Sequence, residues 1–562
     1  MNNSDTAAPP PPESERQPVS LEALEGIFSA ANRSNQPGLV VGISHRGRSI
    51  YRRGFGLASL EYGIANTPET RMRIASVSKQ FTCFGALLLA EEGKLDLDAP
   101  VDKLLPELPR LEGYPTLRQF MTHTSGLHDS WDMHFMARGL VAPGPGIELR
   151  SARRQTAVNF APGQSQLYSN TGYGLLSIAI ERASGMSFEK FMKTRVFEPL
   201  GMRDTESIPS DFMIVPRLAT MHQLLPDGSW RRGIGSSEDN QGAGAGVSTV
   251  DDLLCWLAQL RGHQRKVGSD RTWQAMTEVV TLANGFRTAY ACGLVRNQYR
   301  GVEVMHHGGS LIGVASQLIT VPAHELDIAI IGNCELFNPV ELANQVIDLV
   351  LGDALTEARP AFADSEGLSH LFGTRWHSPT GMLIGFEDVG GKLGFSFFHS
   401  PPIPMLERHG DELRLGGGGA GPYVLKLSEL APAADGTARE ELTMFDAGTA
   451  IRFKRLPAQR PSSLEAGKDL IGSYRVADLD ATARVEAEGE QLLLHIDTNV
   501  GTRSSVLEAL SDHVFGVAVR DPVFPARYAM TVDRSRTGRP AFELDGGRTR
   551  HVRFEPIDAP RG

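Results

Sequence analysis

In the first part of the chain, segments with the hydrophobic pattern of strands alternate with segments that have the pattern of helices. Residues 38–59 alternate apolar and polar side chains on both sides of a turn, which predicts a β-hairpin. Residues 80–97 carry a nearly continuous apolar run stopped by a glycine, which predicts a buried helix. Residues 302–334 predict successive strands joined by turns, and residues 339–355 predict a closing helix. We therefore expect one large mixed domain whose sheet receives strands from both of its ends.

The later part of the chain changes to short alternating strands with frequent glycine turns, a pattern typical of antiparallel barrels. A short motif of leucine, a second apolar residue and glycine begins at Leu371 and again at Leu470. Each copy is followed by an aromatic residue, Trp376 in one case and Tyr474 in the other. This loose match predicts a repeated fold, and residues 456–469 between the copies have the composition of a linker.

The length of 562 residues is too great for one hydrophobic core, because a domain usually spans about 100 to 200 residues. We predict an α+β protein with four segments. They are a disordered polar tail at 1–18, a mixed domain at 19–357, and two antiparallel β-barrel domains at 358–457 and 465–562.

Composition excludes several partners. The formal net charge of −10 argues against a nucleic-acid partner, which requires a surplus of lysine and arginine. No apolar run approaches the roughly 20 residues of a membrane span, and the proline-rich start is not typical of a secretory signal. We expect a soluble, cytoplasmic protein that binds no membrane. The four cysteines lack CxxC spacing, which favours free thiols over a zinc site or disulfides.

The sequence ASVSKQFTCF at residues 75–84 contains a candidate nucleophile and its base. Positions i and i+3 share one face of a helix, so Ser76 and Lys79 can lie within hydrogen-bond distance. A serine attacks only after losing its proton, and a lysine accepts that proton only when its pKa falls from about 10.4 toward neutrality. The apolar run that follows Ser76 predicts the burial that lowers the pKa of Lys79.

The alternative is a polar pair with no catalytic role, because roughly two SxxK matches arise by chance in a chain of this length. One such match is Ser187 and Lys190, at the start of an amphipathic helix that needs no catalytic explanation.

A second candidate element precedes another apolar helix. Tyr168 and Asn170 lie on one turn, where a phenol can protonate a leaving amine and a carboxamide can hold the substrate carbonyl or Lys79. The alternative is a buried tyrosine beside a turn asparagine.

A third candidate element lies on a predicted strand. His307 is followed by two glycines, and Gly309 lets a substrate backbone approach the strand closely. The N–H groups of Ser310 and Ser76 could form an oxyanion hole. His306 also fits an HxG pattern, so the register on this strand stays open.

The three elements together resemble a known family. SVSK at 76–79, YSN at 168–170 and HGG at 307–309 follow the order and spacing of the motifs SxxK, YxN and KTG or HxG of penicillin-recognising serine hydrolases. HTSGL at 123–127 is also similar to a connecting segment of that family. The resemblance covers residues 20–355. It implies a β-lactamase or penicillin-binding-protein-like catalytic domain, an antiparallel sheet with helices, followed by the two barrels.

The third motif narrows the resemblance. D,D-peptidases and β-lactamases have a lysine there that helps to receive the substrate's C-terminal carboxylate, whereas this chain has His307. With a histidine at this position, the chain resembles the esterases and aminopeptidases of the family. A catalytic domain followed by two barrels resembles the domain arrangement of the branch of the family that acts on D-residues. This resemblance implies a homodimer and peptide or amide substrates with a free N-terminal D-residue such as D-alanine.

The resemblance also implies a carboxylate for the substrate's ammonium group, because in similar enzymes a loop of the last barrel supplies an aspartate. Asp521 in AVRDPVFPARY has a matching position. The alternative is a solvated turn aspartate before a proline.

Three readings of the function remain open: a D-aminopeptidase, an esterase or β-lactamase-like hydrolase, and a catalytically silent binding protein on the same fold. The chain lacks the GxSxG and HExxH motifs, and we expect no metal or organic cofactor.

Overall fold

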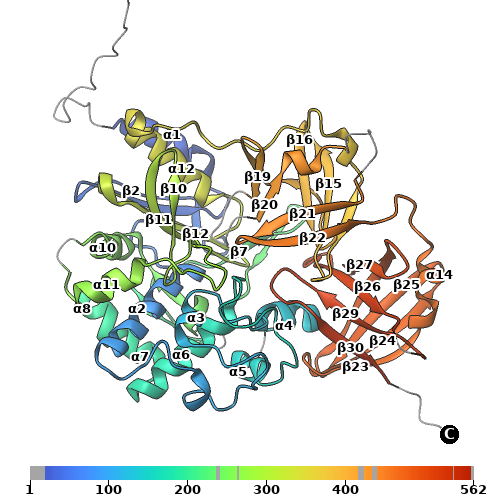
Figure 1. Ribbon diagram of the computed structural model, residues 1–562. Coiled ribbons are helices and arrows are strands. Elements are labelled where there is room, and N and C mark those ends of the chain that lie inside the picture. The colour runs from blue at the N-terminus through green and yellow to red at the C-terminus, as the bar shows by residue number, and fades with distance from the viewer. Residues whose placement is uncertain are drawn as a thin grey trace, which may run out of the picture.

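The computed structural model contains one mixed α+β domain and two β-barrel domains (Figure 1). It describes residues 19–142, 144–235, 241–262, 265–415, 423–432, 439–535 and 537–557. The predicted disordered tail at 1–18 lies outside the described residues. The α+β class and the order of the domains are as predicted.

The mixed domain is built on a six-stranded antiparallel sheet in the order β10-β11-β12-β13-β1-β2. The N-terminal hairpin pairs with the last strand of the domain, so the sheet does receive strands from both ends. The strands are β1 (Leu39–His45), β2 (Arg48–Phe55), β10 (Val295–Tyr299), β11 (Val302–Leu311), β12 (Val314–Val321) and β13 (Leu326–Gly332).

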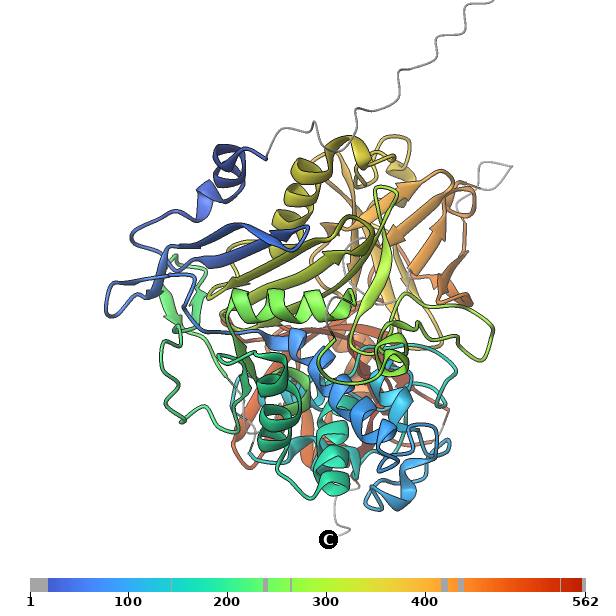
Figure 2. The ribbon, with the colours of Figure 1, turned by 90° about the vertical axis from the view of Figure 1, so that its left-hand side faces the viewer.

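Helices cover both faces of this sheet, because the strand residues are apolar on both sides. Val40 packs into the core around the central helix α2, whereas its neighbour Val41 packs with the terminal helices α1 and α12. Figure 2 shows α12 and α10 on opposite sides of the strands. The helices of the domain are α1 (Leu21–Phe28), α2 (Ser78–Glu91), α3 (Leu117–Met121), α4 (Ser130–Arg138), α5 (Ile147–Ala152), α6 (Asn170–Ser184), α7 (Phe188–Met192), α8 (Glu198–Leu200), α9 (Gln241–Gly244), α10 (Val250–Leu260), α11 (Asp270–Thr277) and α12 (Pro339–Leu351).

Seven short strands form three small sheets beside the main one. They are β3 (Leu57–Ser59), β4 (Ile64–Ala65), β5 (Met72–Arg73), β6 (Glu206–Ser207), β7 (His222–Leu224), β8 (Trp230–Arg232) and β9 (Gly246–Ser248).

The first barrel domain is a nine-stranded antiparallel sheet that nearly closes, in the order β17-β16-β15-β14-β22-β21-β20-β19-β18. Trp376 and Phe386 lie in its core. Its elements are β14 (Arg375–His377), β15 (Leu383–Val389), β16 (Lys392–Phe397), β17 (Ile403–Pro404), β18 (Leu406–His409), β19 (Glu412–Leu415), β20 (Tyr423–Lys426), α13 (Leu427–Leu430), β21 (Glu441–Asp446) and β22 (Thr449–Arg455).

The second barrel domain is a closed eight-stranded antiparallel barrel. A short helix from the predicted linker segment, α14, packs against β25 and β26. The elements are α14 (Ser463–Gly467), β23 (Gly472–Val476), β24 (Ala481–Glu488), β25 (Gln491–Thr498), β26 (Gly501–Ala509), β27 (Val514–Val519), β28 (Arg527–Asp533), β29 (Ala541–Asp545) and β30 (Val552–Pro556).

Helix α4 joins the second barrel to the mixed domain (Figure 1). Its residues Met133, Met136 and Ala137 belong to the same hydrophobic cluster as the barrel interior. A hydrogen bond of 3.0 Å from the Thr156 N–H to the Asp478 carboxylate adds a polar contact. The barrel is therefore packed directly beside the segment that leads into the second motif.

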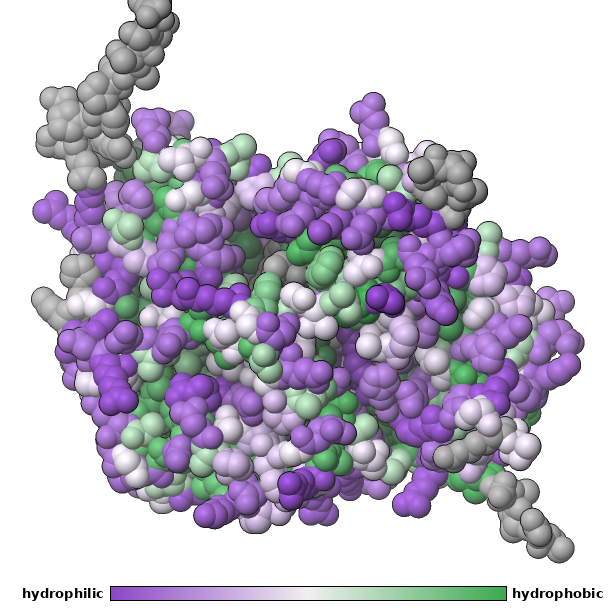
Figure 3. All heavy atoms as spheres, in the orientation of Figure 1, coloured by the Kyte–Doolittle hydropathy of each residue, from purple (hydrophilic) through white to green (hydrophobic). Residues whose placement is uncertain are grey.

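The face seen in Figure 3 is mostly hydrophilic, with hydrophobic residues in small separate groups. Among the described helices, none is long and apolar enough to cross a membrane. All four cysteines are free thiols, as predicted.

A buried ion pair attaches α10 to the sheet, and its loss should destabilise the mixed domain. Arg261 donates to both carboxylate oxygens of Asp327, and the two side chains are 3% and 1% exposed. Asp327→Ala leaves a buried guanidinium without this partner, so we expect a loss of about 3–5 kcal/mol in the free energy of unfolding. Calorimetry of the transition of this domain measures the loss.

The matched control is Asp98→Asn, which breaks the exposed Asp98–Arg118 pair and should cost less than about 1 kcal/mol. Equal shifts of the unfolding temperature in the two variants would contradict this account.

Candidate active site

Ser76 lies in a short 3-10 turn (Ala75–Val77) directly before α2. Ala75 has a φ of 48°, a left-handed conformation that costs free energy for a residue with a Cβ. Across residues 70–89, every residue is buried except Ser76. The hydroxyl therefore faces a cavity from an otherwise buried element, where a substrate can reach it.

Lys79 is fully buried one turn further along. Its Nζ atom lies 3.1 Å from Oγ of Ser76, 2.9 Å from Oδ1 of Asn170 and 2.7 Å from the carbonyl oxygen of Ala243. Burial holds the pKa of Lys79 well below its usual value, and the Arg548 charge acts in the same direction. Both effects favour the neutral amine.

These three contacts orient the neutral amine. An amine has two hydrogens and one lone pair, and the oxygens of Asn170 and Ala243 can only accept hydrogen bonds. Donation to both oxygens leaves the lone pair of Lys79 directed at the Ser76 hydroxyl. This is the arrangement that a general base requires.

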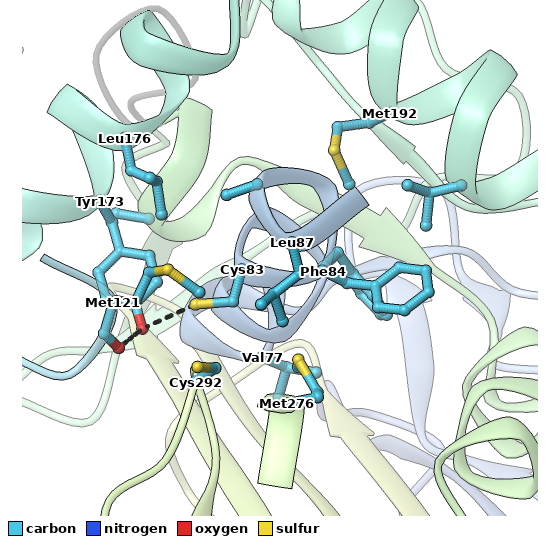
Figure 4. Packing of buried hydrophobic residues seen from close by; sticks show 14 of the residues in the cluster. Val77, Cys83, Phe84, Leu87, Met121, Tyr173, Leu176, Met192, Met276 and Cys292 are labelled. Atoms are coloured by element: carbon cyan, nitrogen blue, oxygen red, sulfur yellow. Dashed lines mark hydrogen bonds between the residues drawn. The ribbon is translucent and has the colours of Figure 1, made fainter. Parts of the chain in front are cut away.

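The environment behind Lys79 is apolar, as Figure 4 shows for the side chains around Cys83. The Tyr173 hydroxyl donates to the Met121 carbonyl at 2.6 Å and lies 3.4 Å from Sγ of Cys83. The ring centroid of Tyr173 is 5.2 Å from Nζ of Lys79. The apolar side chains packed around α2 therefore exclude water from Lys79, and this burial favours its neutral form.

Tyr168 lies in the loop before α6, with its ring centroid 4.8 Å from Nζ of Lys79. Burial raises the pKa of Tyr168 to about 12, although the Arg548 charge and a hydrogen bond with Ser76 act in the opposite direction. The phenol therefore keeps its proton at neutral pH and can donate it.

A buried carboxylate holds the second motif in place. Asp129 accepts hydrogen bonds from the N–H of Asn170 at 2.6 Å and from the N–H groups of Trp131 and Asp132 at 3.0 Å each. It therefore caps the N-termini of α4 and α6 together. This contact fixes the position from which Asn170 reaches Lys79.

His307 ends a chain of hydrogen bonds. The N–H of Ser169 donates to Nδ1 of His123, Nε2 of His123 lies 3.0 Å from the Tyr290 hydroxyl, and that hydroxyl lies 2.9 Å from Nε2 of His307. Nδ1 of His307 lies 2.6 Å from the carbonyl oxygen of Gly308. Each donor finds an acceptor only if both imidazoles are neutral. Burial lowers the pKa of His307 to about 3, which agrees with this assignment.

His306 and His307 both line the cavity, and of the two it is His307 that forms the hydrogen bond with Tyr290. Gly309 is needed for packing: a Cβ there would lie 2.3 Å from both the carbonyl oxygen of Ile74 and the hydroxyl of Ser316. The glycine therefore lets β11 approach the turn that carries the candidate nucleophile.

The site opens into a cavity of about 1030 Å³ to which all three domains contribute. Ser76, Tyr168, Asn170, His307 and Ser310 line it from the mixed domain. The first barrel contributes Tyr423, and turns of the second barrel contribute Phe524, Gly547 and Arg548. The barrels thus complete the wall of the cavity.

Asp521 is not among the residues that line this cavity. Its Oδ1 accepts hydrogen bonds from the N–H groups of Val523 and Phe524, and its Oδ2 lies 3.7 Å from Arg503. Of the described residues that line the cavity, Glu335 is the one with a carboxylate side chain. Burial raises the pKa of Glu335.

The sequence patterns did not identify four of these residues. His123 lies in the HTSGL segment, whose likeness to the family was a usable signal. Tyr290, Glu335 and Arg548 lie in connecting segments without a motif, and only the folded chain brings them to the cavity. No group of three metal-ligating side chains occurs within the described residues.

The fold, and the contact between Ser76 and the buried Lys79, are those of a serine hydrolase. The β-lactamase family model matches residues 24–351, more than half of the 562 residues. The chain belongs to the β-lactamase family, as its three motifs predicted.

Relatives match almost the whole chain. It is 27% identical over 539 residues to a D-aminopeptidase of Gluconobacter oxydans (strain 621H), covering 95% of this chain and 96% of the relative. It is 26% identical over 484 residues to a D-aminopeptidase of Brucella ovis, covering 84% and 85%. A penicillin-binding protein homologue from Pyrococcus abyssi has the same fold, with a TM-score of 0.53 and 19% identity over 96% of this chain and 100% of that one.

The Lys79→Met variant should lose at least about 100-fold in kcat/KM on p-nitrophenyl acetate, because the base that activates Ser76 is removed. Methionine fills a similar volume and needs no polar partner, so circular dichroism and the unfolding temperature should stay close to the wild type.

Lys190→Met at the second SxxK match provides the control and should change activity less than twofold, since Lys190 lies on α7 and does not line the cavity. Retention of more than a tenth of the activity by Lys79→Met would exclude Lys79 as the base.

Proposed function

We propose that the protein is a D-aminopeptidase that releases N-terminal D-residues from peptides or amides through a serine acyl-enzyme. The observation that carries the proposal is the contact between the Ser76 hydroxyl and the fully buried Lys79 beside a cavity walled by all three domains. The relatives named D-aminopeptidase extend over the barrels as well as the mixed domain, and they support the stereochemistry and the free amine.

The proposed reaction begins when Lys79 takes the Ser76 proton and Oγ attacks the substrate carbonyl. The N–H groups of Ser76 and Ser310 stabilise the oxyanion of the tetrahedral intermediate. Tyr168, whose phenol is protonated at neutral pH, gives a proton to the leaving amine as the C–N bond breaks. Lys79 then returns its proton to the Tyr168 phenolate, and the neutral Lys79 takes a proton from the water that hydrolyses the ester.

The neutral third motif agrees with an enzyme whose substrate places no carboxylate at that position. Burial lowers the pKa of His307 to about 3, so the imidazole that contacts Tyr290 and Gly308 is uncharged. A lysine here would supply a positive charge for an anionic group, whereas a neutral imidazole offers only polar contacts and shape.

The substrate's ammonium group requires a carboxylate within the cavity. We assign this role to Glu335 in place of Asp521, because Glu335 lines the cavity while Asp521 caps its own turn and faces Arg503. Glu335 accepts the N–H of Gly313, which orients its carboxylate beside the end of β11.

Initial rates on D-alanine p-nitroanilide, its L-enantiomer and N-acetyl-D-alanine p-nitroanilide test the proposal. We expect hydrolysis of the free-amine D-substrate alone, none in Ser76→Ala, and a KM at least about tenfold higher in Glu335→Gln, because a charged hydrogen bond is lost.

Equal rates on the two enantiomers, or activity on p-nitrophenyl acetate alone, would favour an esterase of the family. No turnover of any substrate, together with no labelling of Ser76 by a fluorophosphonate, would favour a silent binding protein.

A further inference from the structure

Arg548 lies at the tip of the turn between β29 and β30, and the mixed domain holds this turn in position. The N–H of Arg548 donates to Oδ2 of Asp132 at 3.0 Å, and its carbonyl oxygen accepts from Nδ2 of Asn159 at 3.2 Å. Oδ1 of Asn159 accepts the N–H of Arg550 at 2.8 Å. Side chains of the mixed domain therefore bind the backbone on both sides of Arg548.

The guanidinium of Arg548 faces the cavity, and its charge acts on the Asp132 carboxylate from beyond ion-pair distance. It lies 4.7 Å from the ring centroid of Tyr168 and forms no ion pair or side-chain hydrogen bond within the described part of the chain. The neighbouring Arg553 differs, because it pairs with Asp533 at 2.9 Å, whereas Arg550 resembles Arg548 in having a ring contact, with Phe398 at 4.4 Å.

The contact with Tyr168 locates Arg548 relative to the reaction, and this step rests on the proposed function. Tyr168 is the acid that protonates the leaving amine, so the group that departs lies next to it. When the leaving group is an amino acid, its amine and its carboxylate are attached to the same Cα. A carboxylate two bonds from the departing nitrogen is then close to whatever lies over the Tyr168 ring.

We propose that Arg548 binds the C-terminal carboxylate of the leaving amino acid, so that the preferred substrates are dipeptides with a free N-terminal D-residue. A guanidinium matches a carboxylate through two parallel hydrogen bonds, and this geometry favours an acid over the corresponding amide. Together, Glu335 and Arg548 give the cavity two opposite charges, which complement the two ends of a zwitterionic dipeptide.

A different role for Arg548 predicts a different result. If its charge served only to keep Lys79 neutral, or if the side chain only supported the turn, its loss would slow every substrate by the same factor. A carboxylate-binding role instead affects only substrates that carry the carboxylate. The ratio of rates on an acid and its amide therefore separates the two roles.

The experiment measures kcat/KM on D-alanyl-glycine and on D-alanyl-glycine amide. The wild type should prefer the free acid by roughly tenfold to a hundredfold. Arg548→Gln should remove that preference through a higher KM on the acid, whereas any slowing caused by the lost charge near Lys79 and Tyr168 should be the same for acid and amide. Arg548→Lys should keep part of the preference, because it retains the charge without the paired geometry.

Arg520→Gln is the matched control. Arg520 carries the same charge on a loop of the same barrel, pairs with Glu488 at 3.2 Å and does not line the cavity, so the preference should persist. Equal kcat/KM on acid and amide in the wild type, or an equal loss on both in Arg548→Gln, would overturn the inference. If the wild type hydrolyses neither of the two dipeptides nor D-alanine p-nitroanilide, the proposed function is refuted, and this inference with it.

Discussion

The burial of one amine determines the organisation of the site. A charged lysine without solvent is costly, so the fully buried Lys79 is stable here as a neutral base held by two carbonyl oxygens. The apolar run of α2 supplies that burial, and the left-handed turn before it brings Ser76 out to the cavity. The absence of a side chain at Gly309 lets the edge of the main sheet approach this turn. Each of these features serves the contact between hydroxyl and amine.

The two barrels take part in the chemistry by closing the cavity. The mixed domain supplies the polar groups around Ser76, and it keeps His307 of the third motif neutral by burying it. The barrels add the outer wall, including the charge of Arg548. Residues of α4 pack in the core of the second barrel. The Asp129 carboxylate caps α4 and also accepts the N–H of Asn170, so the second barrel and the second motif are held in place by the same helix.

Sequence patterns were sufficient for the fold class and for the three motifs, because helix spacing places Ser76 and Lys79 on one face and because the motifs occur in a known order. They were insufficient where contacts depend on how loops meet. Tyr290 and Arg548 lie in irregular segments: Tyr290 reaches the cavity when the mixed domain folds, and Arg548 only when the second barrel packs against that domain. Asp521 had the expected place in the chain, but its carboxylate accepts hydrogen bonds from the backbone of its own turn. Local hydrogen bonding of this kind is not visible in a pattern of residue types.

The pH dependence of fluorophosphonate labelling, with the labelled peptide identified by mass spectrometry, tests the central claim most directly. Only neutral Lys79 can accept the proton, so labelling should fall as the pH falls through the pKa of Lys79. That pKa should lie well below the ordinary lysine value of about 10.4. We predict a label on Ser76 alone, at a rate already near its maximum at neutral pH. A label on another residue, or a rate that keeps rising until about pH 10, would contradict the account.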